Sequence, residues 1–146
     1  MLFRSSGAKI RFVRHLAPDG VVTMVDPDQM RQVCWNLGLN ACQAMPDGGT
    51  LAVSTRWVAP PVGETEGESV EIVFEDTGPG IPEEHLHKIF YPFFTTKEGG
   101  TGLGLSLVHR IMDEHKGSVQ VESVLGKGTC VKLTLPITGT VVQEVR

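Results

Sequence analysis

Amide side chains recur along one predicted helix at a spacing suited to a shared ligand. They are Gln32, Asn36, Asn40 and Gln43, separated by four, four and three residues. Residues three and four apart lie above one another on a helix, so these amides share one side. An asparagine carbonyl is a hard oxygen that suits Mg²⁺. A solvated helix face is the alternative, although asparagines are mildly unfavourable inside helices.

A second polar motif follows an apolar segment with strand character, and residues 75–82 of that motif read EDTGPGIP. We expect Asp76, at the strand end, to be partly buried, and a buried carboxylate needs hydrogen-bond donors. Gly78 and Gly80 permit a tight turn and a close approach of the backbone to a ligand. An ordinary turn has the same pattern, so this motif alone does not define a binding site.

A third motif is a glycine cluster, GGTGLGL at residues 99–105, which opens a second long helix. Bare amides at a helix N-terminus favour phosphate, because the helix dipole is positive there. The spacing is not that of a dinucleotide fingerprint, which also requires a preceding strand. Residues 126–129, GKGT, are not a P-loop either, because the upstream glycine is missing and a strand follows.

The elements that must position these motifs follow from hydrophobic periodicity. Asp26 is expected to cap the first helix, with Pro27 as its first residue. The buried face of that helix is predicted to contain Met30, Val33, Leu37, Ala41 and Ala44. The pattern predicts strands at 9–16, 21–26, 50–58, 70–75, 118–124 and 129–135, and helices at 27–45, 82–90 and 103–116.

The connections complete this prediction. The first two strands should join around residues 18–20, residues 59–69 should form an exposed hairpin loop, and residues 91–102 a long irregular loop. The sequence therefore predicts an α+β fold. We expect a two-layer α/β sandwich, with a mixed, mostly antiparallel sheet and helices packed on one face.

Composition sets limits on the class of protein. The 146 residues, 40% hydrophobic and 21% charged, suit one domain over 1–146, with a core at about 9–136 and a loose tail at 137–146. The formal charge of −4 offers no footprint for nucleic acid. Without a long apolar run or a signal peptide, we expect a cytoplasmic chain without membrane contact of its own. Three cysteines, Cys34, Cys42 and Cys130, are expected to be reduced, small buried side chains.

In combination and order, the motifs resemble the ATP-binding domain of bacterial two-component sensor histidine kinases, in the GHKL ATPase superfamily. The resemblance covers about residues 9–136 and includes FYPFF at 90–94. The stretches NLGLNACQAMPDGGTL and FYPFFTTKEGGTGLGLSLVHRIMDEHKG look most like the nitrogen-regulation type. The resemblance implies two cofactors, ATP and Mg²⁺.

The resemblance also implies roles for individual residues. Asn40 matches the Mg²⁺ ligand, and Asp76 matches the acceptor of a hydrogen bond from the adenine amino group. Guanine has a carbonyl at that position, so ATP should bind more tightly than GTP. Residues 91–101 match a mobile ATP lid. The implied ATP-binding residues are Asn36, Asn40, Gln43, Ala44, Asp76, Gly78, Gly80, Ile81, Lys97, Gly100, Thr101, Gly102, Leu103, Gly104, Leu105 and Thr129.

The contribution of two of these residues, Gln43 and Lys97, to phosphate binding stays open. Gln43 stands where some of these kinases have lysine, so the phosphate site has one fewer cation. Lys97 is the one cation of the lid segment, and it either reaches the terminal phosphates or is a solvated loop lysine.

The phosphoacceptor of a histidine kinase is a histidine followed by an acidic residue, on a separate dimerisation domain. None of the five histidines fits, because Leu, Leu, Lys, Arg and Lys follow His15, His85, His87, His109 and His115. The expected function is thus that of an excised catalytic domain without a catalytic residue of its own. It is expected to be a monomer that does not phosphorylate itself. It should supply the γ-phosphoryl group of Mg·ATP to the absent domain, for relay to a response regulator.

Two alternatives remain. A GHKL hydrolase of the gyrase, MutL or chaperone kind would carry a general-base glutamate at the position of Asn36, and an asparagine cannot take a proton at neutral pH. Hydrolysis by this chain should therefore be very slow. The other alternative is a nucleotide-gated interaction module, whose lid orders on ATP and presents a surface to a partner.

Overall fold

A mixed β-sheet forms one layer of the protein. The computed structural model describes residues 2–5, 8–17, 23–64, 67–95 and 102–137. In these ranges six strands pair in the order β1-β2-β3-β4-β6-β5. The β2–β3 pair is parallel and the other pairs are antiparallel. The strands are β1 (Leu2–Ser5), β2 (Ala8–His15), β3 (Gly49–Val58), β4 (Ser69–Asp76), β5 (Ser118–Val124) and β6 (Gly128–Pro136).

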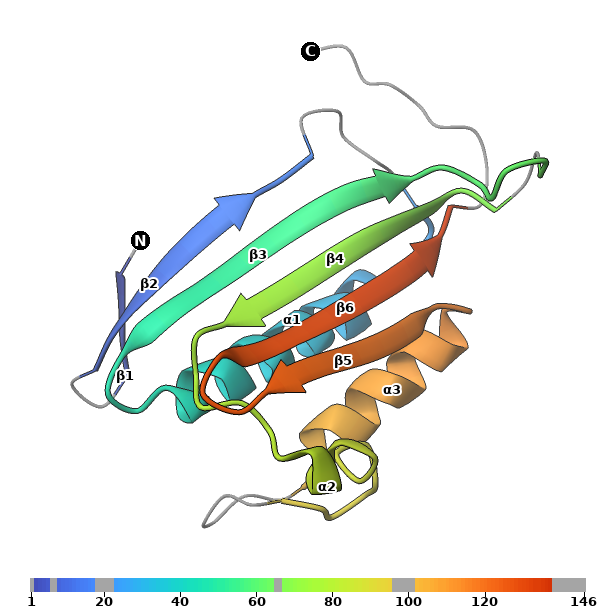
Figure 1. Ribbon diagram of the computed structural model, residues 1–146. Helices are drawn as coiled ribbons and strands as arrows, with labels where there is room; N and C mark the ends of the chain where they lie inside the picture. The colour runs from blue at the N-terminus through green and yellow to red at the C-terminus, as the bar shows by residue number, and fades with distance from the viewer. Residues whose placement is uncertain (1, 6–7, 18–22, 65–66, 96–101, 138–146) are drawn as a thin grey trace.

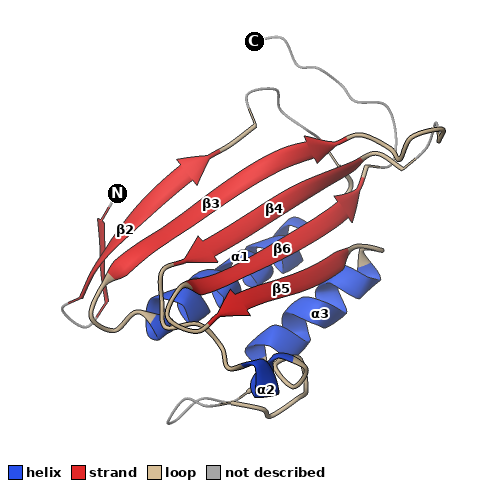
Figure 2. Ribbon diagram, in the orientation of Figure 1, coloured by secondary structure: helices blue, strands red, loops and turns tan. Residues whose placement is uncertain are grey.

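The helices form the second layer, on one face of the sheet (Figure 1; Figure 2). They are α1 (Pro27–Ala44), α2 (Glu83–Leu86) and α3 (Gly104–Glu114). The two long helices, α1 and α3, run beneath the strands, and α2 lies near the start of α3. This arrangement confirms the predicted α/β sandwich with helices on one face.

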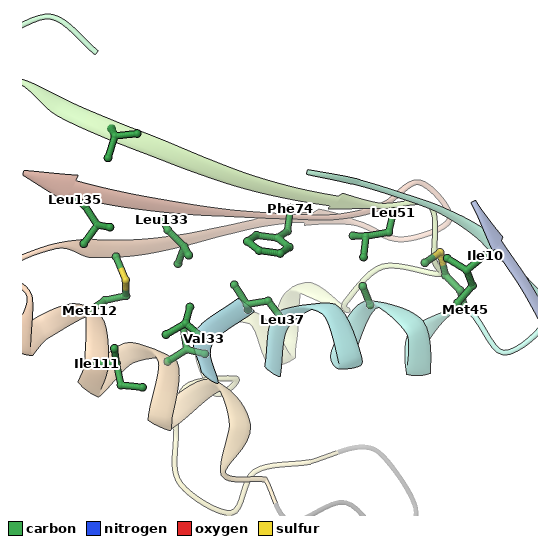
Figure 3. Close-up of a cluster of buried hydrophobic side chains, with 13 residues drawn as sticks. Ile10, Val33, Leu37, Met45, Leu51, Phe74, Ile111, Met112, Leu133 and Leu135 are labelled. Atoms are coloured by element: carbon green, nitrogen blue, oxygen red, sulfur yellow. The ribbon is translucent and has the colours of Figure 1, made fainter. Parts of the chain in front are cut away.

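The hydrophobic core fills the space between the layers (Figure 3). Strand residues alternate between the two faces of a sheet, so every second side chain of a strand enters this core. On β3 and β4 these include Leu51 and Phe74, which face Leu37 of α1. The buried set is Ile10, Val33, Leu37, Ala41, Met45, Leu51, Val70, Phe74, Val108, Ile111, Met112, Leu133 and Leu135.

The start of α1 is fixed as the sequence predicts. Oδ1 of Asp26 accepts hydrogen bonds from the backbone N–H groups of Asp28 (2.9 Å) and Gln29 (3.1 Å). Pro27 is the first helical residue, where no N–H donor is needed. A cap of this kind contributes about 0.5–2 kcal/mol. It also sets the register that turns Val33 inward. The four amides Gln32, Asn36, Asn40 and Gln43, called the amide stripe below, then lie on the flank of the helix.

The predicted strand at 21–26 is wrong in its described part, because residues 23–26 are not in a strand. Instead, Thr23 Oγ1 donates to the Pro136 carbonyl oxygen (2.8 Å), and the Asp26 N–H donates to His115 Nε2 (3.0 Å). The partners of β2 are β3 and the unpredicted β1. The sequence at 21–25, VVTMV, is rich in β-branched side chains, which favour an extended backbone. An extended segment joins a sheet only when a neighbouring strand has a free edge to pair with.

The helix predicted at 82–90 is only Glu83–Leu86. The cysteines are free thiols, but Cys34 is exposed and Cys42 and Cys130 are half-buried, so the expectation of burial is wrong. Among the described helices, none is both long and apolar enough to cross a membrane. The expected tail lies outside the described residues from position 138 onward.

Candidate functional site

Four side chains form a row across one end of the sheet. Leu51, Asp76, Thr129 and Ser123 are successive direct partners on β3, β4, β6 and β5. Direct cross-strand partners share a face of the sheet. Leu51 is buried in the core, so the other three side chains also face the helices. The Asp76 carboxylate therefore lies on the helix side. Its half-burial and its place at the end of β4 are as the sequence predicts.

The turn after β4 packs against the end of α1. The Gly78 N–H donates to Asp76 Oδ1 at 2.9 Å, which folds the backbone back on the carboxylate. A Cβ atom on Gly78 would lie 3.2 Å from the Ala44 carbonyl oxygen and 3.4 Å from its Cβ. Asp76, Gly78 and Ala44, which the sequence assigns to one site, are thus brought together.

The β5–β6 turn holds the other side of this loop. Gly80 has a φ of +79°, and a Cβ atom there would collide with the Val124 carbonyl. The Gly126 N–H donates to the Pro79 carbonyl oxygen at 2.8 Å. Both the positive φ and the close approach require glycine at position 80. The loop after Asp76 is therefore tied to a hairpin from the C-terminal half of the chain.

The hydroxyl groups of Ser123 and Thr129 lie next to this loop. Ser123 Oγ accepts from the Ile81 N–H (2.7 Å) and lies 2.9 Å from Thr129 Oγ1 and 3.0 Å from the Gly128 carbonyl oxygen. Ile81 and Thr129 were predicted from sequence, but Ser123 was not. The alternation of Val119, Val121 and Ser123 along β5 was the one signal that placed its side chain on the helix side.

The amide stripe of α1 faces α3. Asn36 and Asn40 are half-buried, whereas Gln32 and Gln43 are exposed. On the same flank, Gln29 Nε2 donates to Glu114 Oε2 of α3 at 3.4 Å. The stripe therefore runs along the interhelical groove rather than over open solvent, which argues against a purely solvated face.

One amide of the stripe lacks a partner. Asn36 Nδ2 is buried and makes no hydrogen bond within the part of the chain that the structure describes. A buried amide without a partner costs about 1–3 kcal/mol. A bound oxygen-rich ligand would remove this cost.

The start of α3 adjoins the stripe. A Cβ atom on Gly104 would lie 3.9 Å from Asn40 Nδ2. Gly102, at φ +69°, accepts a hydrogen bond from the Phe93 N–H at 2.9 Å. Leu103 is exposed, and Leu105 packs against the core. The structure thus brings one of these predicted site positions, Gly104, next to Asn40, while Lys97, Gly100 and Thr101 lie outside the described residues.

A hollow of about 400 Å³ opens at the same end of the sheet. Asp76 and Thr129 line part of it, but five lining residues alternate with core-facing positions and so face away from the helices. These are Thr50, Ala52, Glu75, Glu122 and Cys130. Burial, and next the carboxylates of Glu75 and Glu122, raise the pKa of the Cys130 thiol. This hollow is therefore not where Asp76, the amide stripe and the start of α3 converge.

Known proteins resemble this chain in both sequence and fold. The family model described as "Histidine kinase-, DNA gyrase B-, and HSP90-like ATPase" matches residues 25–139. Sensor histidine kinase ZraS of Escherichia coli O157:H7 is 44% identical over 112 residues, which is 77% of this chain and 23% of that protein. Sporulation kinase E of Bacillus subtilis (strain 168) is 41% identical over 77% of this chain and 14% of its own length. This chain thus spans less than a quarter of either relative.

Solved structures agree with these relatives. The nucleotide-free catalytic domain of histidine kinase ThkA is 33% identical, with a TM-score of 0.74 over 87% of this chain and 78% of that one. Full-length ShkA in complex with AMPPNP is 25% identical, with a TM-score of 0.75 over 92% of this chain and 27% of that one.

The chain belongs to the family of histidine kinase-, DNA gyrase B- and HSP90-like ATPases. Within that family it is an ATP-binding domain homologous to the catalytic domains of sensor histidine kinases.

Proposed function

We propose that this chain holds Mg·ATP between α1, the loop after β4 and the start of α3, and presents the γ-phosphoryl group to a histidine of a separate dimerisation domain. The phosphoryl group then passes to a response regulator. One observation carries the proposal. The two ends of a nucleotide site meet α1 at two points, where Gly78 packs on Ala44 and Gly104 adjoins Asn40.

The base end is formed by the loop after β4. Asp76 is the acceptor for the adenine amino group, and an ionised acceptor makes this a strong hydrogen bond. Gly78, Gly80 and Ile81 form the wall, and Thr129 lies beside Asp76 on the next strand. In support, the Gly78 N–H and the β5–β6 turn hold this loop in one conformation.

The phosphate end is formed by α1 and α3. Asn40 offers an amide oxygen to Mg²⁺, which prefers few protein ligands together with phosphate and water oxygens. The residues fit this pattern, because the half-buried Asn40 offers one hard amide oxygen beside the start of α3. When bound, the ion would neutralise phosphate charge. The buried Nδ2 of Asn36 is a ready donor to a phosphate oxygen, and we assign Gln43, Leu103 and Leu105 to the same phosphate end.

The chain itself orients the nucleotide and does not activate water. Phosphoryl transfer depends mainly on positioning and electrostatic stabilisation. Asn36 has no basic group, so it spares bound ATP from hydrolysis. In this proposal Lys97, Gly100 and Thr101 belong to a lid over the phosphates, and the isolated chain is a cytoplasmic monomer.

Radiolabelled ATP tests the proposal. The chain is incubated with labelled Mg·ATP, alone and with a histidine-containing helical dimerisation domain supplied as a separate polypeptide. The expected result is label on the added domain and none on this chain. Label on any of the five histidines of this chain would contradict it. Nucleotide binding without transfer to any such domain would favour an interaction module instead.

A further inference from the structure

Thr77 lies between Asp76 and Gly78, two residues at the base end of the proposed site. Its backbone N–H donates to the Thr50 carbonyl oxygen at 3.1 Å, and its Oγ1 accepts the Thr50 N–H at 2.9 Å. Thr50 precedes Leu51 on β3, and Leu51 is the direct partner of Asp76. Thr77 therefore extends the β3–β4 pairing by one residue, with its side-chain oxygen in the role of a backbone carbonyl.

The same hydroxyl contacts the end of α1. Thr77 Oγ1 donates to Sδ of Met45 at 3.6 Å, and Met45 is the buried C-cap residue of α1. A hydroxyl can accept one hydrogen bond and donate its proton in another, so both contacts form together. Gly49 leaves room for them, because a Cβ atom there would lie 2.5 Å from Met45 Sδ and 2.7 Å from Thr77 Oγ1. One side chain thus links the start of β3, the loop after β4 and the end of α1.

These links act on the geometry of the base end. Ala44 precedes Met45, and its carbonyl oxygen would lie 3.2 Å from a Cβ atom on Gly78. The Gly78 N–H in turn donates to Asp76 Oδ1 at 2.9 Å. The separation of α1 from the turn and the direction of the Asp76 carboxylate are therefore both set by residues adjacent to Thr77 or to its partner Met45.

We propose that Thr77 is a positioning residue for the base of the nucleotide. Its hydroxyl holds the loop after β4 against β3 and α1, so that the remaining lone pairs of Asp76 meet the amino group of adenine. Thr77 acts through Asp76 and Gly78 and not by contact with the nucleotide. This inference rests on the proposed adenine site and adds to it a residue that sets its selectivity for adenine.

The affinities of Mg·ADP and Mg·GDP test the inference, measured by competition calorimetry for the wild type, Thr77→Val and Thr77→Ser. Thr77→Val keeps the shape of the side chain but has a methyl group in place of the hydroxyl. It should weaken Mg·ADP about three- to ten-fold, as expected for one neutral hydrogen bond, and Mg·GDP less than about two-fold. Guanine has a carbonyl in place of the amino group, so it has no hydrogen bond to Asp76 to lose. Thr77→Ser keeps the hydroxyl and should restore the Mg·ADP affinity.

Thr50→Val is the matched control. It removes a hydroxyl from the residue bonded to Thr77, but it keeps the backbone N–H and carbonyl groups that Thr77 contacts. The Thr50 side chain lies on the face of the sheet away from the helices, because Leu51 beside it enters the core. Both affinities should equal those of the wild type.

The ratio of the two affinities separates positioning from simple support of the fold. Thr77→Val also leaves the Thr50 N–H without its side-chain acceptor, so binding is measured where each variant is fully folded by urea titration. If Thr77→Val does not fold, Thr77→Ala, which has no γ atom beside Met45, is measured in the same way. Equal losses for both nucleotides, or an unchanged Mg·ADP affinity, would overturn the inference but leave the adenine site standing. Absence of Mg·ADP binding by the wild type would overturn both.

Discussion

Asp76 and Thr129 are direct partners across the antiparallel β4–β6 pair, with both side chains facing the helix layer. Asp76 is followed at once by the tight turn at Gly78, and Thr129 begins the part of β6 that carries Leu133 and Leu135 into the core. The base end of the candidate site is therefore built at one end of the sheet, where two neighbouring strands that are distant in sequence meet.

Asp76→Ala is expected to lower ATP affinity about ten- to a hundred-fold without unfolding the chain. The variant removes a charge-assisted hydrogen bond worth about 1.5–3 kcal/mol. Calorimetry with Mg·ATP measures the effect. Glu75→Ala is the matched control, since it removes the neighbouring carboxylate from the opposite face of the sheet and should bind ATP normally. Equal affinity for ATP in the folded Asp76→Ala variant and the wild type would reject the adenine assignment.

Asn40→Ala should weaken Mg·ATP far more than metal-free ATP. The reason is that the Asn40 amide oxygen is proposed to contact the ion rather than the nucleotide. Titrations with and without EDTA measure the two affinities. Gln32→Ala removes an exposed amide from the same side of α1 and should affect neither. A loss of the same size under both conditions would exclude the metal role.

Gly128→Ala should destabilise the fold by about 3 kcal/mol or more. Its φ is +111°, and a Cβ atom would collide with the carbonyl oxygen of Asp76. Gly126→Ala is the comparison, because φ is +80° but a Cβ atom there meets nothing within 4 Å. That variant should lose only the backbone term, about 1–2 kcal/mol. Urea denaturation of both variants measures the difference. Similar midpoints would show that the Asp76 carbonyl oxygen leaves room for a Cβ atom at position 128.

The Cys130 thiol should react slowly with iodoacetamide near pH 8. Burial, then the carboxylates of Glu75 and Glu122, raise its pKa, and only the thiolate is the nucleophile. Glu75→Gln removes one of these charges, so the pH midpoint of alkylation should fall. The rate is followed by mass spectrometry in a background without Cys34 and Cys42. The folded state favours the neutral thiol, so this contribution to stability is present in full below the unfolded pKa and is lost as the pH rises from the unfolded to the raised folded pKa. An unchanged midpoint in Glu75→Gln would show that the carboxylate does not act on Cys130.

Most of the sheet and both long helices could be predicted because their patterns are local. Asp26 and Pro27 mark the start of α1, and residues three and four apart on α1, such as Val33 and Leu37, mark its buried face. The strand predicted at 21–26 failed because strand pairing depends on distant partners. The neighbouring strand β2 already had both partners, since it pairs with β1 and β3.

The residues of the candidate site likewise divide into those with a local sequence signal and those that depend on distant contacts. Asp76, Gly78 and Gly80 stand out in the sequence because glycines beside a strand-end carboxylate are a local signal. Ser123 has no such signal, since its importance comes from a contact with Ile81, 42 residues away, and from its place beside Thr129 across the β5–β6 pair. Likewise, only the structure shows that Asn36 Nδ2 is buried without a partner in the described region.

Calorimetric titration of the wild-type chain with Mg·ADP and Mg·GDP tests the central claim most directly. The account predicts saturable binding of Mg·ADP at one site, with Mg·GDP weaker by at least about ten-fold, because the guanine carbonyl would face the Asp76 carboxylate. Equal affinities for the two nucleotides, or no binding of either, would contradict the account.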